Sequence, residues 1–519
     1  MKNIALHNLP RRMRVIAPAA LAALTILTGC RREVRLPDTY TASEERAFLY
    51  PDYTDVIIPP NIAPLNFMVC DADAEEFIAD FQGTGGNLKA AADKDGKIRI
   101  DSTEWKALLE QHRGQTLQVS LYGRKKDGWV KYRSHSLTVA EEPIDGFLSY
   151  RLIEPGYEYY RQLGLYQRDL TGFDVSAIYE NNRMYDNENN HCVNCHNYQN
   201  YDTGRMLFHV RGNHGGTLIA QDGRVEKIQI RHDSILSAGV YPSWHPTLPL
   251  IAFSTNQTGQ AFHMKHAEKI EVLDTASDLF LYDAENNTAK TILRGDDELE
   301  TFPCWSPDGR CLYYCTAKRP DMSEVPDSMI SHTMLLRYDS LKYNIMRLSF
   351  DEKTRTFGAP DTVVNCAARG RSASVPRISP DGRYLLYTLG DYGQFHIWHK
   401  SADLWVKDLQ TDTPPYPLEA ANSPEADSYH TWSSNGRWIV FTSRREDKNY
   451  SRVYIAYFDK NGKGHKAFLL PQEDPEQNIV LLKSYNVPEL TRNAVIPSRS
   501  DFHKIIYETE GKAVRFTSE

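Results

Sequence analysis

The stretch Trp305-Ser306-Pro307-Asp308-Gly309-Arg310 recurs in variant forms along the chain from residue 244 onward. An apolar strand ends at the start of the stretch, Asp-Gly makes a tight turn, and a second apolar strand leads to Tyr314. Each version therefore predicts a β-hairpin closed by an aromatic residue. The other versions are Ile378-Ser379-Pro380-Asp381-Gly382-Arg383 before Tyr387, Trp432-Ser433-Ser434-Asn435-Gly436-Arg437 before Phe441, and a degraded Trp244-His245-Pro246 before Phe253.

A second hairpin follows three of these four units. It carries aspartates at its rim in Asp278–Asp283 and Asp403–Asp408, and Tyr454–Asp459 takes the same place in the last unit. Two hairpins per repeat of about 40–50 residues predict four-stranded blades of a β-propeller. The Ser-Pro-Asp-Gly-Arg turn resembles that of TolB-like propellers. The resemblance implies a mainly β domain of about six four-stranded blades over residues 201–519, but not a function.

The same spacing, continued towards the N-terminus, places one more unit at Asp202–His209. Its glycine and arginine match those of the turn at Asn435-Gly436-Arg437, and Gly216–Gly223 supplies its second hairpin. The first blade is therefore predicted to begin just after residue 200. This leaves no room for a separate cytochrome domain between the blade and the motif that precedes it.

That motif is Cys192-Val193-Asn194-Cys195-His196. Two thiols at this spacing can each form a thioether with a haem vinyl group, and the imidazole after the second thiol becomes the proximal iron ligand. A redox dithiol would need a βαβ context and a zinc site a second Cys/His pair, and the sequence offers neither. We expect one covalent haem c held by Cys192, Cys195 and His196.

The sixth iron ligand has three candidates. His209 ranks first, because other blades have an aromatic core residue at its position; a hydrogen-bonded core histidine is the alternative. Met206 ranks second and His214 third. His209 can ligate only if the motif leaves the sheet before residue 200, because directly opposed cross-strand residues only about 5 Å apart cannot hold an iron between them.

Residues 1–29 are predicted to be a lipoprotein signal peptide. A basic leader precedes the apolar run Val15–Leu27, which is shorter than the about 20 residues that span a bilayer. Leu27-Thr28-Gly29-Cys30 resembles the bacterial lipobox, which implies lipidation of Cys30; an ordinary secretory signal is the alternative. The resemblance implies a lipid-anchored protein of the bacterial cell envelope facing the periplasm, a location where c-type haems are attached.

Three segments lie between the signal and the propeller. Residues 30–60, rich in charge and proline, are predicted to form a tether. Residues 61–142 show short strands, a hairpin around 125–128 and a helix capped by Asp101, which favour an immunoglobulin- or fibronectin-like β-sandwich. Residues 143–200 are a tyrosine-rich connector that contains the haem motif.

The overall charge bears on one class of partner, the nucleic acids. The net charge of −8 gives no nucleic-acid footprint.

An odd number of cysteines remains once Cys30, Cys192 and Cys195 are assigned, which argues against a full disulfide framework. Cys304 and Cys311 flank a turn symmetrically, so a cross-strand disulfide is one option and buried free thiols are the other. The remaining cysteines are Cys70, Cys304, Cys311, Cys315 and Cys366.

Three functions are compatible with this pattern. The favoured one is a non-enzymatic lipoprotein whose single haem serves electron transfer or redox-linked binding of an envelope protein partner. The second is a TolB-like scaffold for envelope assembly or cytochrome maturation with a structural haem. The third is a haem redox enzyme with its active site in the propeller channel. The enzyme ranks last because the histidines outside the motif do not recur at one fixed position of the repeats.

Overall fold

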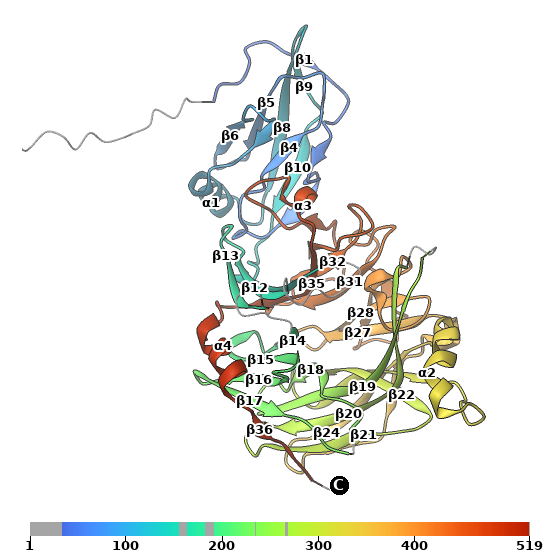
Figure 1. Ribbon diagram of the computed structural model, residues 1–519. Coiled ribbons are helices and arrows are strands. Elements are labelled where there is room, and N and C mark those ends of the chain that lie inside the picture. Colours follow the sequence, from blue (N-terminus) through green and yellow to red (C-terminus); the bar gives the residue numbers. More distant parts are fainter. Residues whose placement is uncertain (1–33, 155–162, 182–190, 234, 265–267, 518–519) are drawn as a thin grey trace, which may run out of the picture.

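The structure is a computed structural model that describes residues 34–154, 163–181, 191–233, 235–264 and 268–517 (Figure 1). Strands far outnumber helices, so the predicted mainly β class is confirmed. Figure 1 shows an N-terminal β domain above a larger body of sheets that runs from residue 147 to the C-terminus. The predicted signal peptide and Cys30 lie outside the described residues.

The N-terminal domain consists of two sheets and a helix. One sheet has the order β1-β9-β8-β10-β3, with β5 and β6 joined to β8, and the other is β2-β4-β7. The helix begins after Asp101, whose side chain accepts hydrogen bonds from the backbone N–H groups of Thr103 and Glu104. The elements are β1 Thr41–Ala42, β2 Leu49–Tyr50, β3 Val56–Ile58, β4 Phe67–Val69, β5 Glu76–Gln82, β6 Asn87–Ala91, β7 Lys97–Ile98, α1 Ser102–Gln111, β8 Thr116–Lys125, β9 Gly128–Lys131 and β10 His135–Val139.

Much of the segment expected to be a tether belongs to this domain instead. β1 pairs with β9, β2 with β4, and β3 with β10. Val56 and Ile58 are fully buried, with 1% and 0% of their surface exposed. The charge and proline content of residues 30–60 therefore did not mark a linker, because short strands between proline turns bury alternate apolar side chains.

Residues 147–491 form a succession of four-stranded antiparallel units, as the repeats predicted. Each unit pairs its strands in chain order, apart from the first, whose innermost strand is β35. The strands are β11 Phe147–Ile153, β12 Gly164–Asp169, β13 Val175–Glu180 and β35 Ser484–Thr491; β14 His191–Gln199, β15 Asp202–Gly212, β16 Gly216–Gln221 and β17 Arg224–Gln229; β18 Val240–Trp244, β19 Leu250–Phe262, β20 Ile270–Asp283 and β21 Thr288–Leu293; β22 Glu298–Trp305, β23 Cys311–Lys318, β24 Asn344–Asp351 and β26 Asp361–Val364, with β25 Thr356–Phe357 beside β24; β27 Ser372–Ile378, β28 Tyr384–Gly390, β29 Asp403–Asp408 and β30 Tyr416–Pro417; and β31 Asp427–Trp432, β32 Trp438–Ser443, β33 Arg452–Tyr457 and β34 Phe468–Leu469.

The innermost strands meet one another around a central axis. β14 contacts β18, and the succession continues through β22, β27 and β31 to β35, which contacts β14 again. β35 also pairs with β11, so a C-terminal strand completes the unit that opens the propeller. This is the arrangement of blades in a β-propeller.

The segment 143–200, expected to be an irregular connector, supplies three strands of that opening unit and the innermost strand of the next one within the described ranges. β11 pairs with β12, and β12 with β13. Three of its tyrosines are strand residues: Tyr150 and Tyr179 are buried, and Tyr150 stacks against Tyr166. The pattern of repeated turns does not predict this unit, because its own turns lack Asp-Gly.

The repeated turn forms as expected. In the turn after Trp305, Gly309 has φ +71° and its N–H bonds the carbonyl of Ser306, whose hydroxyl accepts from the N–H of Cys311 at 2.9 Å. Ser379 and Ser433 make the same bond in the other turns. However, the turn closes between Ser306 and Cys311, so Cys304 is paired with Tyr313 and not with Cys311. The suggested Cys304–Cys311 disulfide is therefore wrong, and both thiols are free.

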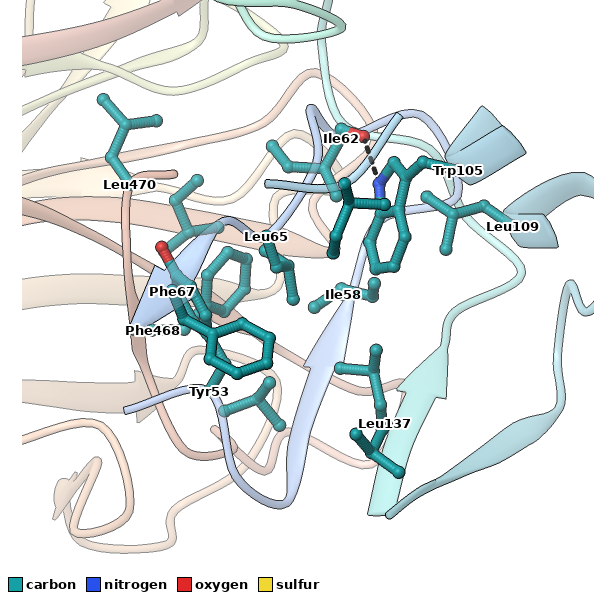
Figure 2. Packing of buried hydrophobic residues seen from close by; sticks show 14 of the residues in the cluster. Tyr53, Ile58, Ile62, Leu65, Phe67, Trp105, Leu109, Leu137, Phe468 and Leu470 are labelled. Atoms are coloured by element: carbon teal, nitrogen blue, oxygen red, sulfur yellow. Dashed lines mark hydrogen bonds between the residues drawn. The ribbon is translucent and has the colours of Figure 1, made fainter. Parts of the chain in front are cut away.

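The N-terminal domain packs against the last blade through one continuous apolar core (Figure 2). Phe468 of β34 meets the ring of Tyr53 edge-on at 6.4 Å between centroids. Trp438 is fully buried and donates its indole N–H to the carbonyl of Glu142 at 3.0 Å. Polar contacts surround this core, including Lys97 to Asp474 at 2.9 Å. The two parts therefore share a core.

The C-terminal segment runs across the outer edges of three units (Figure 1). α4 Arg499–Glu508 contacts β13 and β17, β36 Lys512–Ala513 pairs with β17, and β37 Arg515–Phe516 pairs with β21. Phe502 and Ile506 are buried against the second unit. The other short elements are α2 Asp327–Leu336, η3 Tyr338–Ser340, η4 Ala367–Arg369, η5 His396–Trp398 and α3 Gln477–Val480.

Candidate functional site

Every innermost strand carries a β-bulge at the same place. At each bulge the pairing register shifts, and one residue other than glycine adopts a φ between 47 and 54°. A bulge turns a side chain out of the sheet, and all of these residues line the central cavity. They are Cys195, Tyr241, Phe302, Val375, Tyr429 and Val487.

The residue after each bulge position is also restricted. It is proline in four strands, at Pro242, Pro303, Pro376 and Pro488, and histidine in the other two, at His196 and His430. Proline suits a bulge because it has no N–H to pair. The Cys195-His196 half of the motif therefore occupies the place of Val375-Pro376 and Val487-Pro488.

A second repeated feature of the sequence, beside the turns, marks the bulge positions of the innermost strands. Pro242, Pro303 and Pro376 each stand four residues before the proline of a repeated turn. A second proline at a fixed spacing inside a strand is typical of a bulge. Extending that spacing to the motif would have placed His196 in an innermost strand.

The motif lies within β14 and not outside the sheet. Asn194 is directly opposite His209, and Asn197 is opposite Leu207. The condition for ligation by His209, that the motif leaves the sheet before residue 200, is therefore not met. The expectation that the first blade begins only after the motif is also wrong, because the motif forms the innermost strand of that blade.

A cavity of about 790 Å³ opens at the end of the channel where the innermost strands begin. We call it the funnel. Its walls come from all six four-stranded units. They include the part of β19 and β20 that extends past the neighbouring strands, residues 256–262 and 270–277, which we call the arm. Ile270 on the arm packs against Ile397 and Trp398 of η5. The funnel is within the size range of ligand sites.

The described lining of the funnel has an excess of positive charge. It contains Arg151, Arg211, Arg377 and Arg444 but a single carboxylate, Glu154. Arginines grouped in a cavity favour anionic ligands, because the low-dielectric walls strengthen the field inside it. Six aromatic rings share the lining: Tyr241, Phe262, Phe302, Phe395, Trp398 and Tyr429.

Two buried side chains of the motif face this funnel with polar atoms that no other described residue satisfies. Nε2 of His196 and Oδ1 of Asn194 have no hydrogen-bond partner within the described ranges, although the two residues are only 4% and 5% exposed. Nε2 of His196 lies 3.8 Å from Oε2 of Glu489, a carboxyl group whose pKa burial raises to about 7, and the ring also hydrogen-bonds the backbone of Val487. Burial lowers the pKa of His196 to about 4, so its imidazole is neutral at pH 7. A neutral imidazole is the form that binds metals.

The two thiols of the motif differ in their access to the funnel. Cys195 lines the funnel and is partly exposed. Cys192 is buried and lies opposite Arg211, on the same face of the sheet as Asn194 and His209, because residues two apart share a face. Cys195 and His196 therefore line the funnel side by side, whereas Cys192 is not part of its lining.

The other predicted ligands have ordinary partners. Nδ1 of His209 lies 3.1 Å from the hydroxyl of Thr217, and burial lowers the pKa of His209 to about 3. Met206 is fully buried in the apolar core between the first two blades. His214 packs on the ring of Tyr507. These contacts favour the alternative of core histidines.

Two features are missing from the part of the chain that the structure describes, a metal-binding cluster and a membrane-spanning helix. No group of three or more His, Cys, Asp or Glu side chains in the described ranges is arranged to hold a metal ion. In the same ranges, no helix is both long and apolar enough to cross a membrane.

Comparison with known proteins gives similarity in fold only. No protein-family model and no curated protein matches the chain. Among solved structures, TolB from Acinetobacter baumannii is 13% identical, with a TM-score of 0.42 over 75% of this chain and 85% of that one. A putative TolB from Agrobacterium tumefaciens is 14% identical, with a TM-score of 0.35 over 66% and 98%. A puromycin-hydrolyzing peptidase from Mycobacterium tuberculosis is 12% identical, with a TM-score of 0.37 over 81% and 56%.

Proposed function

We propose that this protein is a six-bladed, TolB-like binding propeller of the bacterial envelope, with the funnel as its binding site. The observation that carries this proposal is the funnel itself: a cavity at one end of the channel, lined by four arginines, six aromatic rings and the unsatisfied polar atoms of His196 and Asn194. Buried polar atoms without partners indicate a site that a ligand completes. The lipobox resemblance at Cys30 supports attachment to the membrane, with the propeller in the periplasm.

Site-specific photo-crosslinking in cells tests the scaffold role. A photoreactive residue replaces Phe262, which lies at the funnel and is 59% exposed. The matched control replaces Thr354, an exposed residue of the turn between β24 and β25. We expect a discrete adduct from the first position and none from the second. Adducts of the same size and yield from both positions, or none from Phe262, would contradict binding at the funnel.

We propose as a second function that the site carries one covalent haem c. Cys192 and Cys195 would hold the haem and His196 would ligate the iron; bound haem would supply one-electron redox chemistry. The specific support is the Cys195-His196 pair, which replaces Val-Pro at the bulge and presents a thiol and a neutral imidazole to the funnel. With haem in place the scaffold would serve electron transfer or redox-linked binding of an envelope partner.

Denaturing gels test the covalent haem. Protein produced in a host that attaches c-type haem should show peroxidase staining at its full size, and Cys192→Ala with Cys195→Ala should abolish the stain. Cys70→Ala, at an exposed cysteine of the N-terminal domain, is the control and should keep it. Equal staining of the double variant and the wild type would refute attachment at the motif.

A further inference from the structure

The arm leaves one strand edge of the propeller without a partner. β19 has 13 residues, whereas β18, its neighbour on the channel side, has 5 and pairs with β19 no further than Ser254. Among the described strands, none pairs with β19 beyond Ser254 on that side. β19 and β20 continue together past this point and form the arm (Figure 1). Because β18 is the innermost strand of the blade, the unpaired edge of β19 faces the channel.

The hydrogen bonds of the arm show which backbone groups point to this edge. The N–H of His263 bonds the carbonyl of Lys269, at the start of β20, at 2.9 Å. In an antiparallel pair such bonded positions alternate with positions whose groups point the other way. The N–H and C=O groups of Thr258, Gln260 and Phe262 therefore point away from β20, towards the channel.

The groups on this edge lose their partners along the arm. The N–H of Asn256 still donates to the hydroxyl of Ser237 at 3.1 Å. Further along, Thr258 and Gln260 are exposed, and Phe262 is 59% exposed. The backbone groups of these three residues are therefore accessible to a ligand.

The sequence of this edge does not protect it. Folded proteins usually guard an open strand edge with charged residues, proline or a covering segment. Residues 256–262, Asn-Gln-Thr-Gly-Gln-Ala-Phe, contain neither a charge nor a proline. Elsewhere the chain covers its edges, because β36 pairs with β17 and β37 pairs with β21. The edge of the arm is thus left open where the cavity lies.

The other side of the arm is held in place. Nε2 of His399 lies 2.8 Å from Oε2 of Glu271, and both side chains are only 1% exposed. Ile270 packs against Ile397 and Trp398. The open edge is therefore in position before a partner arrives, which lowers the entropy cost of binding.

The funnel determines the charge of a segment that pairs with this edge. Thr258, Gln260 and Phe262 also line the funnel, so alternate side chains of an added strand would point into it. The described lining has four arginines and one glutamate, an excess of three positive charges. Acidic side chains suit such a cavity, because its walls strengthen the positive field.

We infer that the open edge of the arm binds an extended, acidic segment of a partner protein by β-strand addition, with backbone bonds to Thr258, Gln260 and Phe262 and alternate side chains in the funnel. This inference rests on the funnel being the binding site of the proposed scaffold. It adds the form and the charge of the partner segment. A second copy of the chain fits less well, because the uncharged residues 256–262 would leave the charge of the funnel unmatched.

The first test uses the mature chain and a short fluorescent peptide that alternates valine and glutamate. Fluorescence anisotropy should show saturable binding of one peptide per chain, weakened by added salt. The same peptide with lysine in place of glutamate is the control and should not bind. N-methylation of the valines or of the glutamates should abolish binding in one case and spare it in the other, because only every second amide of an added strand faces the arm.

The second test removes one backbone donor of the arm. Gln260→Pro deletes an N–H on the open edge and keeps the bonds to β20, because that N–H points away from β20. It should weaken binding of the glutamate peptide at least about tenfold. Gln260→Val keeps the N–H, is the matched control and should bind as the wild type does. Thermal melts show that both variants are folded.

Contrary results overturn the inference. Absence of glutamate-peptide binding, binding of both methylated peptides, or equal binding by Gln260→Pro and Gln260→Val would refute strand addition. Equal binding of the lysine peptide would refute recognition of an acidic segment. A dimer in analytical ultracentrifugation that Gln260→Pro abolishes would assign the edge to a second copy.

Crosslinking in cells from position 262 separates this failure from that of the proposed function. If strand addition is correct, the adduct should be lost in Gln260→Pro and kept in Gln260→Val. An adduct that persists in Gln260→Pro would refute strand addition and leave binding at the funnel standing. Absence of the adduct in the chain without either substitution would refute the proposed scaffold itself.

Discussion

Cys195 has the same backbone conformation as five residues in other blades, none of which is a cysteine. Its φ of +54° is set by the bulge and not by the motif. Val375 and Val487 show that a β-branched residue is accommodated at this position, and the prolines after them show that the next residue needs no N–H. The fold therefore accepts Val-Pro where this chain has Cys-His.

This equivalence predicts the outcome of a double substitution. Cys195→Val with His196→Pro should fold with a free energy of unfolding within about 1 kcal/mol of that of Cys192→Ala with Cys195→Ala, because it restores a pair that the fold uses twice. Both variants lack haem attachment, so the comparison is free of any stabilisation by haem. Urea denaturation measures the difference. A loss of several kcal/mol would mean that Cys195 and His196 have a structural role.

His430 follows the bulge residue of β31, as His196 follows that of β14. Its burial predicts that the stability of the protein depends on pH. Burial lowers the pKa of His430 to about 3, so the folded protein keeps this imidazole neutral while the unfolded chain takes up a proton below about pH 6.5. The unfolded state then binds more protons, and stability falls as the pH falls. His430→Gln should remove about 1 kcal/mol of the stability loss between pH 7 and 5.5.

Urea denaturation at the two pH values measures this change. His332→Gln, at an exposed histidine of α2, is the control and should keep the wild-type pH dependence. An unchanged loss of stability in His430→Gln would show that His430 is not the neutral, buried group described.

At the scale of elements, the repeated turns could be predicted because the chemistry is local. Asp-Gly and the serine before it fix the hairpin wherever they occur. The unit built from β11, β12, β13 and β35 could not be found in the same way, because it lacks that turn and joins strands from opposite ends of the propeller. The position of β14 also depends on its neighbours, so the sequence predicted the site residues of the motif but not their place in a sheet.

The C-terminal segment predicts a destabilising mutation far from the funnel. Phe502 is 1% exposed and packs edge-on against Phe208 at 5.0 Å between centroids. Phe502→Ala should lower the free energy of unfolding by about 3–5 kcal/mol, because it leaves a cavity between α4 and the blade. Ile496→Ala, at a side chain that is 68% exposed, should change it by less than about 0.5 kcal/mol. Similar small effects of both would mean that the segment is only loosely attached.

At the scale of the molecule, the shared core joins parts that the sequence suggested were separate. A sandwich domain on a tether would unfold independently, whereas Tyr53 and Phe468 lie in one core although they are far apart in sequence (Figure 2). Composition could not reveal this, since an apolar residue at an interface looks like any other core residue.

The shared core predicts cooperative unfolding. Scanning calorimetry of the mature chain should give a single transition, and Phe468→Ala should move that whole transition to lower temperature, at a cost of about 3–5 kcal/mol. Phe48→Ala, at a side chain that is 69% exposed, is the control and should leave it in place. Two well-separated transitions in the wild type would show that the N-terminal domain and the propeller are independent.

The second proposed function depends on Cys192, Cys195 and His196 of β14 holding a covalent haem. The most direct measurement is the pyridine-haemochrome spectrum of purified, acid-acetone-extracted protein from a host that attaches c-type haem. The wild type should retain one haem per chain after extraction, and Cys195→Val with His196→Pro should retain none while giving the same folded circular dichroism spectrum. A wild-type protein that folds and retains no haem would refute covalent haem attachment and leave the scaffold proposal standing.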